Sequence, residues 1–356
     1  MTDAIDRPGA VRNGEQLDMT AVEIYLKDTI AGLEGPLTIE QFPSGASNLT
    51  YLISCAGRSL VLRRPPIGTK AATAHDMGRE VRVLSALCEH WPYAPRPLAY
   101  CMDISIIGAP FYIMERIEGI ILRKDLPSGL FATPARLHRL YERFVEVLCE
   151  LHALDYRRIG LADLGKPEGY VRRQVLGWSR RYRAARTPDV PDFEAVMGWL
   201  EEKMPPESPG AAIIHNDFKL DNIVLDPADP LRIIGVLDWE MCTIGDPLMD
   251  LGSTLGYWVE KDDPPERQIM RSMPTHLAGA LTRRAFVDLY GRLSGLEMDR
   301  FDFYYCFGLF RLAVIVQQIY YRYYHGQTRD ERFRRYAAGV PVLERAAQAV
   351  IGGSAM

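Results

Sequence analysis

IIHNDFKLDNIVLDPADPLRIIGVLDWE, residues 213–240, is the stretch around which the rest of this chain is organised. The apolar run at residues 211–214 predicts a short buried strand that leads directly into His215 and Asp217. We therefore expect the chemistry of the protein to begin where this strand ends.

Two further apolar runs, residues 223–225 and 233–237, are separated by the turn-forming segment 226–230, and they predict a β-hairpin with a five-residue connection. Antiparallel pairing folds the chain back on itself, so Asn222 and Asp238 should emerge close together at one end of the hairpin. Amide and carboxylate oxygens are hard ligands, suited to Mg²⁺ that is held jointly with nucleotide phosphates.

The order H-x-D-x-x-x-x-N, followed by an Asp at the end of a strand, resembles the catalytic segment of protein-kinase-like enzymes. The resemblance implies that Asp217 accepts the proton of a substrate hydroxyl, that Asn222 and Asp238 hold Mg²⁺, and that His215 belongs to the same catalytic set. The variants HND and LDWE, in place of HRD and DFG, resemble the aminoglycoside-phosphotransferase family of small-molecule kinases.

The composition of the whole chain is that of an ordinary soluble globular protein, with 47% hydrophobic and 25% charged residues among 356. A formal net charge of −4 argues against nucleic acid or an anionic membrane as the main partner. Six scattered cysteines without CxxC spacing indicate reduced thiols and argue against a zinc site: Cys55, Cys88, Cys101, Cys149, Cys242 and Cys306. With no secretory signal at the start and an apolar stretch at 307–321 that is too short to span a bilayer, we expect a cytoplasmic protein.

The N-terminal third predicts a small sheet. Residues 1–16 should form a flexible tail and residues 18–33 a short helix; strands are predicted at 38–42, 49–54 and 58–63. The loop between the first two strands is a candidate for covering nucleotide phosphates, with an ordinary hairpin turn as the alternative; it comprises Ser44, Gly45, Ala46, Ser47 and Asn48.

Arg63 is the basic residue expected to reach the α- and β-phosphates, with Arg64 as the competing register. Residues 74–90 are helical by period, and Glu80 on that helix is expected to pair with Arg63 unless it is merely an exposed acid near a helix start.

Two strands, 98–106 and 110–117, are predicted next, around a turn at Gly108. The second resembles the strand and linker that join the two lobes of a kinase. Backbone groups of Glu115 and Ile117 would then bind the adenine edge, with the Met114 side chain behind it.

Beyond residue 117 the pattern is mainly helical. A helix from about 167 to 183 carries a basic face, either solvated or an anion site, from which we select four candidate substrate residues: Arg172, Arg173, Trp178 and Arg181. His152 is expected to pack under the catalytic loop, and Asp246 and Asp250 to cap and brace it.

Taken together, the motifs LVLRRPP, IHNDFKLDN and GVLDWEMCTIGDPLMDLG resemble the aminoglycoside-phosphotransferase-like family, in the branch of kinase domains associated with acyl-CoA dehydrogenases. The resemblance implies an α+β, bilobal protein-kinase-like fold with a small β-rich N-lobe at 17–116 and a larger, mainly helical C-lobe at 117–356. It also implies a phosphotransferase that uses ATP and Mg²⁺ on an alcohol group.

The acceptor implied by that branch is a 4-hydroxyacyl-CoA or a related hydroxy acid. Aminoglycoside, choline and sugar acceptors, and a catalytically silent nucleotide-binding module, remain alternatives. The chain has no length left for a flavin-binding dehydrogenase, so dehydrogenase activity is not expected. The sequence does not indicate the oligomeric state.

Overall fold

The computed structural model describes residues 7–43, 48–66, 76–127, 129–205, 210–328 and 330–353. The chain forms two compact units, which we call the sheet unit (residues 1–121 with 223–242) and the helical unit (residues 122–222 with 243–356). The α+β class expected from the sequence is confirmed, with the larger sheet in one unit and most helices in the other. The division differs from the expected one, because the hairpin at 223–242 groups with the N-terminal unit.

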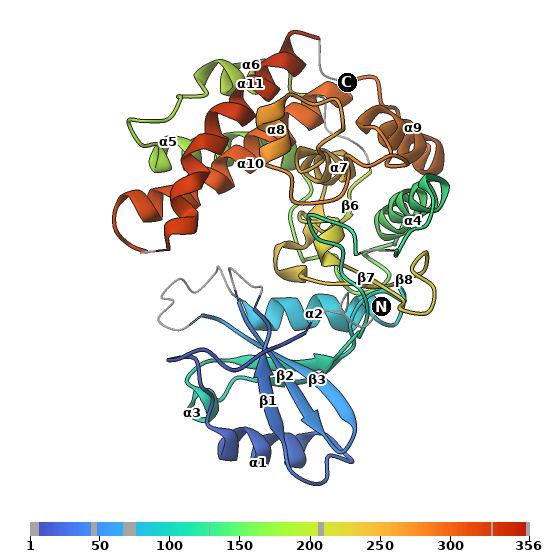
Figure 1. The fold of residues 1–356 in the computed structure, drawn as a ribbon, viewed down its shortest axis with the longest axis vertical. Coiled ribbons are helices and arrows are strands. Elements are labelled where there is room, and N and C mark those ends of the chain that lie inside the picture. The colour runs from blue at the N-terminus through green and yellow to red at the C-terminus, as the bar shows by residue number, and fades with distance from the viewer. Residues whose placement is uncertain are drawn as a thin grey trace. The chain divides into compact units, whose positions relative to one another are not determined.

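The sheet unit contains a five-stranded antiparallel sheet with strand order β1-β2-β3-β5-β4 (Figure 1). Its strands are β1 (Thr38–Gln41), β2 (Leu49–Cys55), β3 (Arg58–Arg64), β4 (Pro97–Cys101) and β5 (Phe111–Glu115).

Two helices cover opposite faces of this sheet (Figure 1). Helix α1 (Met19–Thr29), capped by Asp18, buries Val22 and Leu26 in an apolar core on one face. Helix α2 (Met77–Leu87), capped by Asp76, faces the other side. Val81 and Cys88 of this segment are only half-buried; the buried residues of α2 are Met77, Glu80, Val83, Leu84 and Leu87.

The strand predicted at 98–106 ends early, because residues 104–107 form a helical turn, α3 (Ile104–Ile107). The carboxylate of Asp103 accepts a hydrogen bond from the Ser105 N–H and starts the turn, and Gly108 ends it with a left-handed φ of 77°. Local capping thus overrides the β-branched composition of this segment.

The N-terminal tail is bound to the sheet over its described part. Gly9 forms a β-bridge with Gln41, whose side-chain oxygen accepts a hydrogen bond from Arg12 N–H at 2.9 Å. The Tyr51 hydroxyl donates to the Glu15 carbonyl at 2.7 Å. The loose tail expected from polar composition is therefore not observed for residues 9–15, and residues 1–6 lie outside the described residues.

The predicted hairpin is present as β7 (Ile223–Leu225) and β8 (Ile233–Val236). Its connection is longer than expected, residues 226–232, and is closed by an ion pair between Asp226 and Arg232. Leu225 also bridges Ile120, which attaches the hairpin to the rest of the sheet unit.

The helical unit contains a two-stranded sheet, β6 (Ala212–Ile214) paired with β9 (Thr243–Gly245), among helices. The α-helices are α4 (Pro134–His152), α5 (Tyr170–Ala185), α6 (Glu194–Glu202), α7 (Pro247–Gly256), α8 (Pro265–Ile269), α9 (Arg283–Ser294), α10 (Phe301–Tyr324) and α11 (Gly339–Ile351). Three short 3₁₀ segments lie elsewhere in the described chain, at Leu220–Asn222, Trp239–Met241 and Glu331–Ala338.

Helix α10 is the central helix of this unit and contacts α5, α6, α7 and α11 (Figure 1). At 24 residues it is longer than the apolar run suggested and passes a length and composition test for a membrane span, but 78% of its most apolar window is buried within the structure. Its crossing with α7 is very close, because a Cβ atom on Gly308 would overlap the carbonyl of Gly252.

Candidate active site

The loop that follows β6 is held by one buried carboxylate from α7. Asp250 accepts the His215 N–H and the Asn216 N–H, each at 2.7 Å, through different oxygens. The expectation that Asp250 braces this loop is confirmed. Asp246 caps α7 by accepting the Leu248 N–H at 2.8 Å, as expected.

Asp250 is itself supported from below by His152. The Nε2 atom of His152 lies 3.2 Å from Asp250 and Nδ1 lies 2.7 Å from the Tyr290 hydroxyl. Burial would raise the pKa of Asp250, but the hydrogen bond and positive potential from His152, with the His215 N–H, outweigh it and hold that pKa below its usual value. The carboxylate is therefore ionised and accepts all three contacts.

The conformation of the loop turns the chain sharply before Asp217. Asn216 has a left-handed φ of 65°, a region that Asn tolerates better than most side chains. The Asp217 N–H donates to Nδ1 of His215 at 3.2 Å. His215 is fully buried, so it cannot contact a substrate as the catalytic grouping implied; it orients the loop instead.

The carboxylate of Asp217 is the chemically available group of this loop. Its Oδ2 accepts from Asn222 Nδ2 at 3.1 Å and lies 3.1 Å from Lys219 Nζ. Lys219 also pairs with Asp221 at 3.6 Å and lies over the Tyr257 ring at 5.1 Å.

Sequence reasoning missed Lys219, although its position two residues after Asp217 was a usable signal. Burial would lower the pKa of its ammonium group, but the neighbouring charges of Asp217 and Asp221 outweigh burial and raise that pKa. Lys219 is therefore a fixed positive charge beside Asp217.

A second charged cluster lies in the sheet unit. The guanidinium of Arg63 contacts three carboxylates: Glu80 at 3.2 Å, Asp238 at 2.5 Å and Glu240 at 3.4 Å. Burial opposes the charge of Arg63, but these carboxylates, with Glu80 foremost, raise its pKa well above the usual value. We call this set the Arg63 cluster.

The contacts of the Arg63 cluster show that Arg63 is the arginine that faces these acids. Arg64, the competing register, is directed elsewhere and donates to the Ile107 carbonyl at 2.8 Å. Glu80 is 2% exposed, so the alternative of an exposed acid near a helix start is wrong.

Glu240 is a second residue that sequence reasoning missed, although it lies two positions after Asp238. It accepts a hydrogen bond from Asn48 Nδ2 at 2.7 Å. Asn48 is the last residue of the candidate phosphate loop; Ser44, Gly45, Ala46 and Ser47 lie outside the described residues.

The linker at the end of β5 has backbone groups with distinct partners. The Glu115 N–H donates to the Arg96 carbonyl at 2.9 Å. Of the two backbone groups of Glu115, only the carbonyl could therefore contact an adenine. The Met114 side chain is buried, and the Ile117 N–H has no backbone acceptor within the described chain. This pattern is compatible with the proposed adenine contacts.

The four candidates on α5 differ in their surroundings. Arg173 donates to the backbone carbonyls of Glu168 and Lys166, and Arg172 is exposed. Arg181 lies over the ring of the buried Trp178, with 4.6 Å from its Cζ to the ring centroid. The structure thus pairs Trp178 with Arg181 and directs Arg173 to the backbone.

Burial lowers the pKa of Arg181, and positive charge from Arg311 and Arg180 lowers it further. Arg311 contacts the same Trp178 ring at 5.2 Å. The surroundings of Trp178 therefore carry concentrated positive charge.

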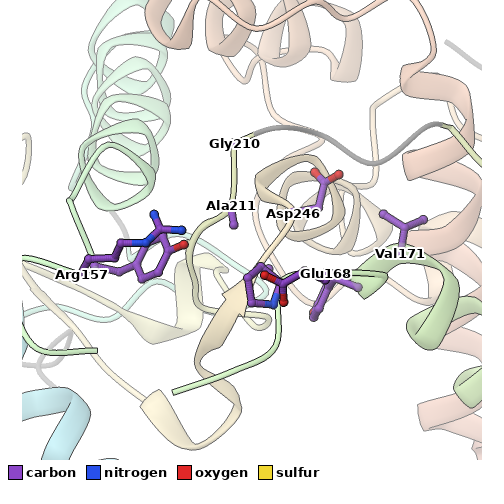
Figure 2. A pocket seen from close by; sticks show the side chains of 10 residues that line it. Arg157, Glu168, Val171, Gly210, Ala211 and Asp246 are labelled. Atoms are coloured by element: carbon purple, nitrogen blue, oxygen red, sulfur yellow. The ribbon is translucent and has the colours of Figure 1, made fainter. Parts of the chain in front are cut away.

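A cavity of about 370 Å³ lies in the helical unit (Figure 2). Gly210 and Ala211, which line it, precede β6, whereas Asp217 follows that strand. Tyr170 in its wall donates to Asn216 Oδ1 at 3.4 Å. The lining residues are Tyr156, Arg157, Pro167, Glu168, Tyr170, Val171, Gly210, Ala211, Gly245 and Asp246.

Two residues have the chemistry of magnesium ligands. Asn222 uses its Nδ2 to bond the Asp217 carbonyl and carboxylate, which leaves its amide oxygen for another partner. The Asp238 side chain is 35% exposed. Within the described ranges no group of three or more His, Cys, Asp and Glu side chains could hold a metal by itself.

Comparison with known proteins shows the family of this chain. The sequence profile described as "Phosphotransferase enzyme family" matches residues 38–287. The mouse protein acyl-CoA dehydrogenase family member 10 is 37% identical over 320 residues, which cover 89% of this chain but 30% of the relative. The chain thus spans about a third of the length of that relative.

Solved structures show the same fold. A candidate aminoglycoside phosphotransferase from Ralstonia eutropha superimposes with a TM-score of 0.80 at 29% identity, covering 96% of this chain and all of the other. A ternary complex of a thermostable mutant of the aminoglycoside phosphotransferase APH(4)-Ia with ADP and hygromycin B has a TM-score of 0.59 at 16% identity, covering 94% of this chain and 99% of that one. On the strength of the matched profile over 250 residues and the HND loop that it contains, this chain belongs to the phosphotransferase enzyme family.

Proposed function

We propose that this protein is an ATP- and Mg²⁺-dependent kinase that phosphorylates a hydroxyl group of a small molecule. The observation that carries the proposal is Asp217, a partly exposed carboxylate on a loop whose backbone is fixed by Asp250 and His215. A fixed carboxylate is what general-base assistance to an alcohol requires.

The proposed step is a direct phosphoryl transfer. The acceptor hydroxyl, oriented by Asp217, forms a bond to the γ-phosphorus of ATP while the bond from that phosphorus to the β–γ bridging oxygen breaks. ADP departs and the hydroxyl proton passes to Asp217. Lys219, whose ammonium lies 3.1 Å from Asp217, balances the carboxylate charge before transfer.

Asn222 and Asp238 are the proposed holders of Mg²⁺. The hairpin pairs Ile223 with Val236, so the residues just outside the two strands leave the hairpin at the same end. The metal would neutralise charge on the phosphate oxygens during transfer.

Nucleotide binding is proposed for the Arg63 cluster, the loop from Ser44 to Asn48 and the backbone of Glu115 and Ile117. Arg63 contacts three carboxylates, one of them Asp238. A bound Mg²⁺–ATP would add a cation beside Asp238 and offer Arg63 a phosphate partner.

The acceptor is proposed to be an anionic hydroxy compound, a hydroxyacyl-CoA or hydroxy acid. The support is the positive charge of Arg181 over Trp178, together with the acyl-CoA name of the long relative. Cationic acceptors such as an aminoglycoside or choline would meet like charge there. Arg172 and Arg173 stay candidates at the edge of this site, and the cytoplasm stays the proposed location.

The direct test is incubation of the full chain with ATP and Mg²⁺ and a panel of acceptors, followed by mass spectrometry for a phosphate adduct. The panel contains 4-hydroxyacyl-CoAs, free hydroxy acids, choline, simple sugars and hygromycin B. We expect adducts on the anionic acceptors. Phosphorylation of choline, a sugar or hygromycin B alone would reject the acceptor class, and nucleotide binding with no adduct at all would favour a silent binding module.

The basic site is tested by Arg181→Gln, with Arg180→Gln as the matched control on the neighbouring residue. Charge-assisted hydrogen bonds to phosphate contribute roughly 1.5–3 kcal/mol each, so Arg181→Gln should raise KM for a hydroxyacyl-CoA about tenfold or more. The KM for ATP should stay unchanged in both variants. An unchanged KM for the acyl-CoA in Arg181→Gln would exclude this contact.

A further inference from the structure

The peptide unit that joins Asn216 to Asp217 has both of its polar atoms engaged. Its N–H, on Asp217, donates to Nδ1 of His215 at 3.2 Å. Its carbonyl, on Asn216, accepts a hydrogen bond from Nη2 of Arg311 at 2.7 Å. The plane of this peptide is therefore held on two sides immediately before the proposed base.

Arg311 reaches this peptide from far along the chain. It lies on α10, 95 residues after Asn216, and is 3% exposed. Burial of a guanidinium costs free energy unless hydrogen bonds compensate it. Its Cζ also lies 5.2 Å from the Trp178 ring centroid, a distance at which an aromatic face stabilises a cation.

The backbone conformation of Asn216 explains why contacts from Asp250 and Arg311 matter here. Asn216 has a φ of 65°, which is less favourable than the right-handed region for a residue with a side chain. Its N–H is held by Asp250 and its carbonyl by Arg311, so the two contacts hold the peptides on either side of Asn216 and oppose rotation about its φ and ψ bonds. Loss of either contact permits the chain before Asp217 to relax.

We infer that Arg311 is a positioning residue for phosphoryl transfer: by holding the Asn216 carbonyl it sets the direction in which the Asp217 carboxylate meets the acceptor hydroxyl. The inference rests on the proposed function, since it gives Asp217 the role described above. A displacement of about 1 Å at reacting groups can cost on the order of a hundredfold in rate.

The test compares Arg311→Met, which keeps an unbranched apolar stem but removes the guanidinium, with Arg311→Lys, which keeps a positive charge and a donor group. Arg322→Met is the matched control, because Arg322 is exposed on the same helix. Turnover and KM are measured for ATP and a 4-hydroxyacyl-CoA. A charge-assisted hydrogen bond predicts a fall in kcat of about tenfold to a hundredfold for Arg311→Met.

The pattern of the kinetic changes decides the role of Arg311. We expect both KM values to stay within about twofold in Arg311→Met, partial recovery of kcat in Arg311→Lys, and wild-type kinetics in Arg322→Met. A raised KM for the acyl-CoA with unchanged kcat would assign Arg311 to substrate binding. A lower melting temperature with unchanged kcat per folded molecule would assign it to stability alone.

A second measurement does not depend on the acceptor. Hydrogen exchange followed by mass spectrometry on peptides covering residues 214–218 should show at least tenfold faster exchange in Arg311→Met and no change in Arg322→Met. If wild-type protein phosphorylates none of the acceptors, the proposed function fails. Unchanged exchange in a folded Arg311→Met or Arg311→Lys variant would overturn the positioning role itself.

Discussion

The two halves of the candidate machinery are held in different ways. In the sheet unit, the Arg63 cluster consists of side chains that contact one another, with one guanidinium among Glu80, Asp238 and Glu240. In the helical unit, the loop before Asp217 is held through its backbone, by Asp250 and Arg311.

The difference suggests which contacts a bound nucleotide would rearrange and which it would leave in place. Side-chain ion pairs can exchange partners when Mg²⁺ and phosphates arrive, because ionic contacts depend on the charges present. Backbone hydrogen bonds from buried groups have no such exchange partner, so they fix geometry. We therefore expect substitutions in the Arg63 cluster to change nucleotide binding and substitutions at the loop to change turnover.

The largest effect is expected for Asp217→Asn. Removal of the proposed general base should lower kcat by about 10²–10⁴-fold and leave Mg²⁺–ATP affinity nearly intact. Asp229→Asn, in the exposed turn of the hairpin, is the control. Steady-state phosphotransfer and nucleotide titration measure the two quantities, and wild-type turnover in Asp217→Asn would remove the base assignment.

Asp238→Ala tests the other half of the comparison. It removes a proposed metal ligand, so affinity for Mg²⁺–ATP should fall by more than about tenfold, while affinity for metal-free ATP changes much less. Titration calorimetry with and without Mg²⁺ gives both values. Equal losses in the two titrations would point to a packing role for Asp238.

Asp250→Asn should lower the free energy of unfolding by about 1–3 kcal/mol, because an amide cannot accept every hydrogen bond made by the carboxylate. The pKa of Asp250 is lower in the folded protein than its ordinary value of about 3.9. The unfolded state therefore binds more protons near that pH, and the contribution to stability is present above about pH 4 and lost as pH falls through the folded pKa.

Urea unfolding between pH 3 and pH 6 measures this contribution in wild type and Asp250→Asn. The difference between the two proteins should shrink toward the acid end of the range. A difference that stays constant with pH would show that the carboxylate charge of Asp250 is not the stabilising feature.

The smallest effect is expected for Arg63→Lys. Arg63 uses Nη1 for Glu80 and Nη2 for Asp238, and a single ammonium cannot hold both. We expect about a tenfold loss in ATP affinity with kcat nearly unchanged. Arg58→Lys, earlier on the same strand, is the control, and a normal ATP affinity in Arg63→Lys would show that a point charge suffices.

The sequence predicted which residues form the candidate site better than it predicted the residues that hold them in place. The spacing of Asp217, Asn222 and Asp238 and the strand alternation around Arg63 are local patterns, so they could be recognised without coordinates. Arg311 could not be recognised in this way, because its contact with the Asn216 carbonyl depends on how α10 packs. The helical turn at 104–107 was missed for a different reason, since Asp103 capping competed with a strand-like composition.

The crossing of α7 and α10 fixes a distance that neither helix could set alone. Gly252 lies two residues after Asp250 on α7, and Gly308 lies three residues before Arg311 on α10. Because neither glycine has a side chain, the two backbones approach closely, and each helix supplies one contact to Asn216: Asp250 on α7 accepts its N–H, and Arg311 on α10 donates to its carbonyl. The proposed orientation of Asp217 therefore depends also on Gly252 and Gly308, two residues with no polar side chain of their own, because they permit this close crossing of the helices.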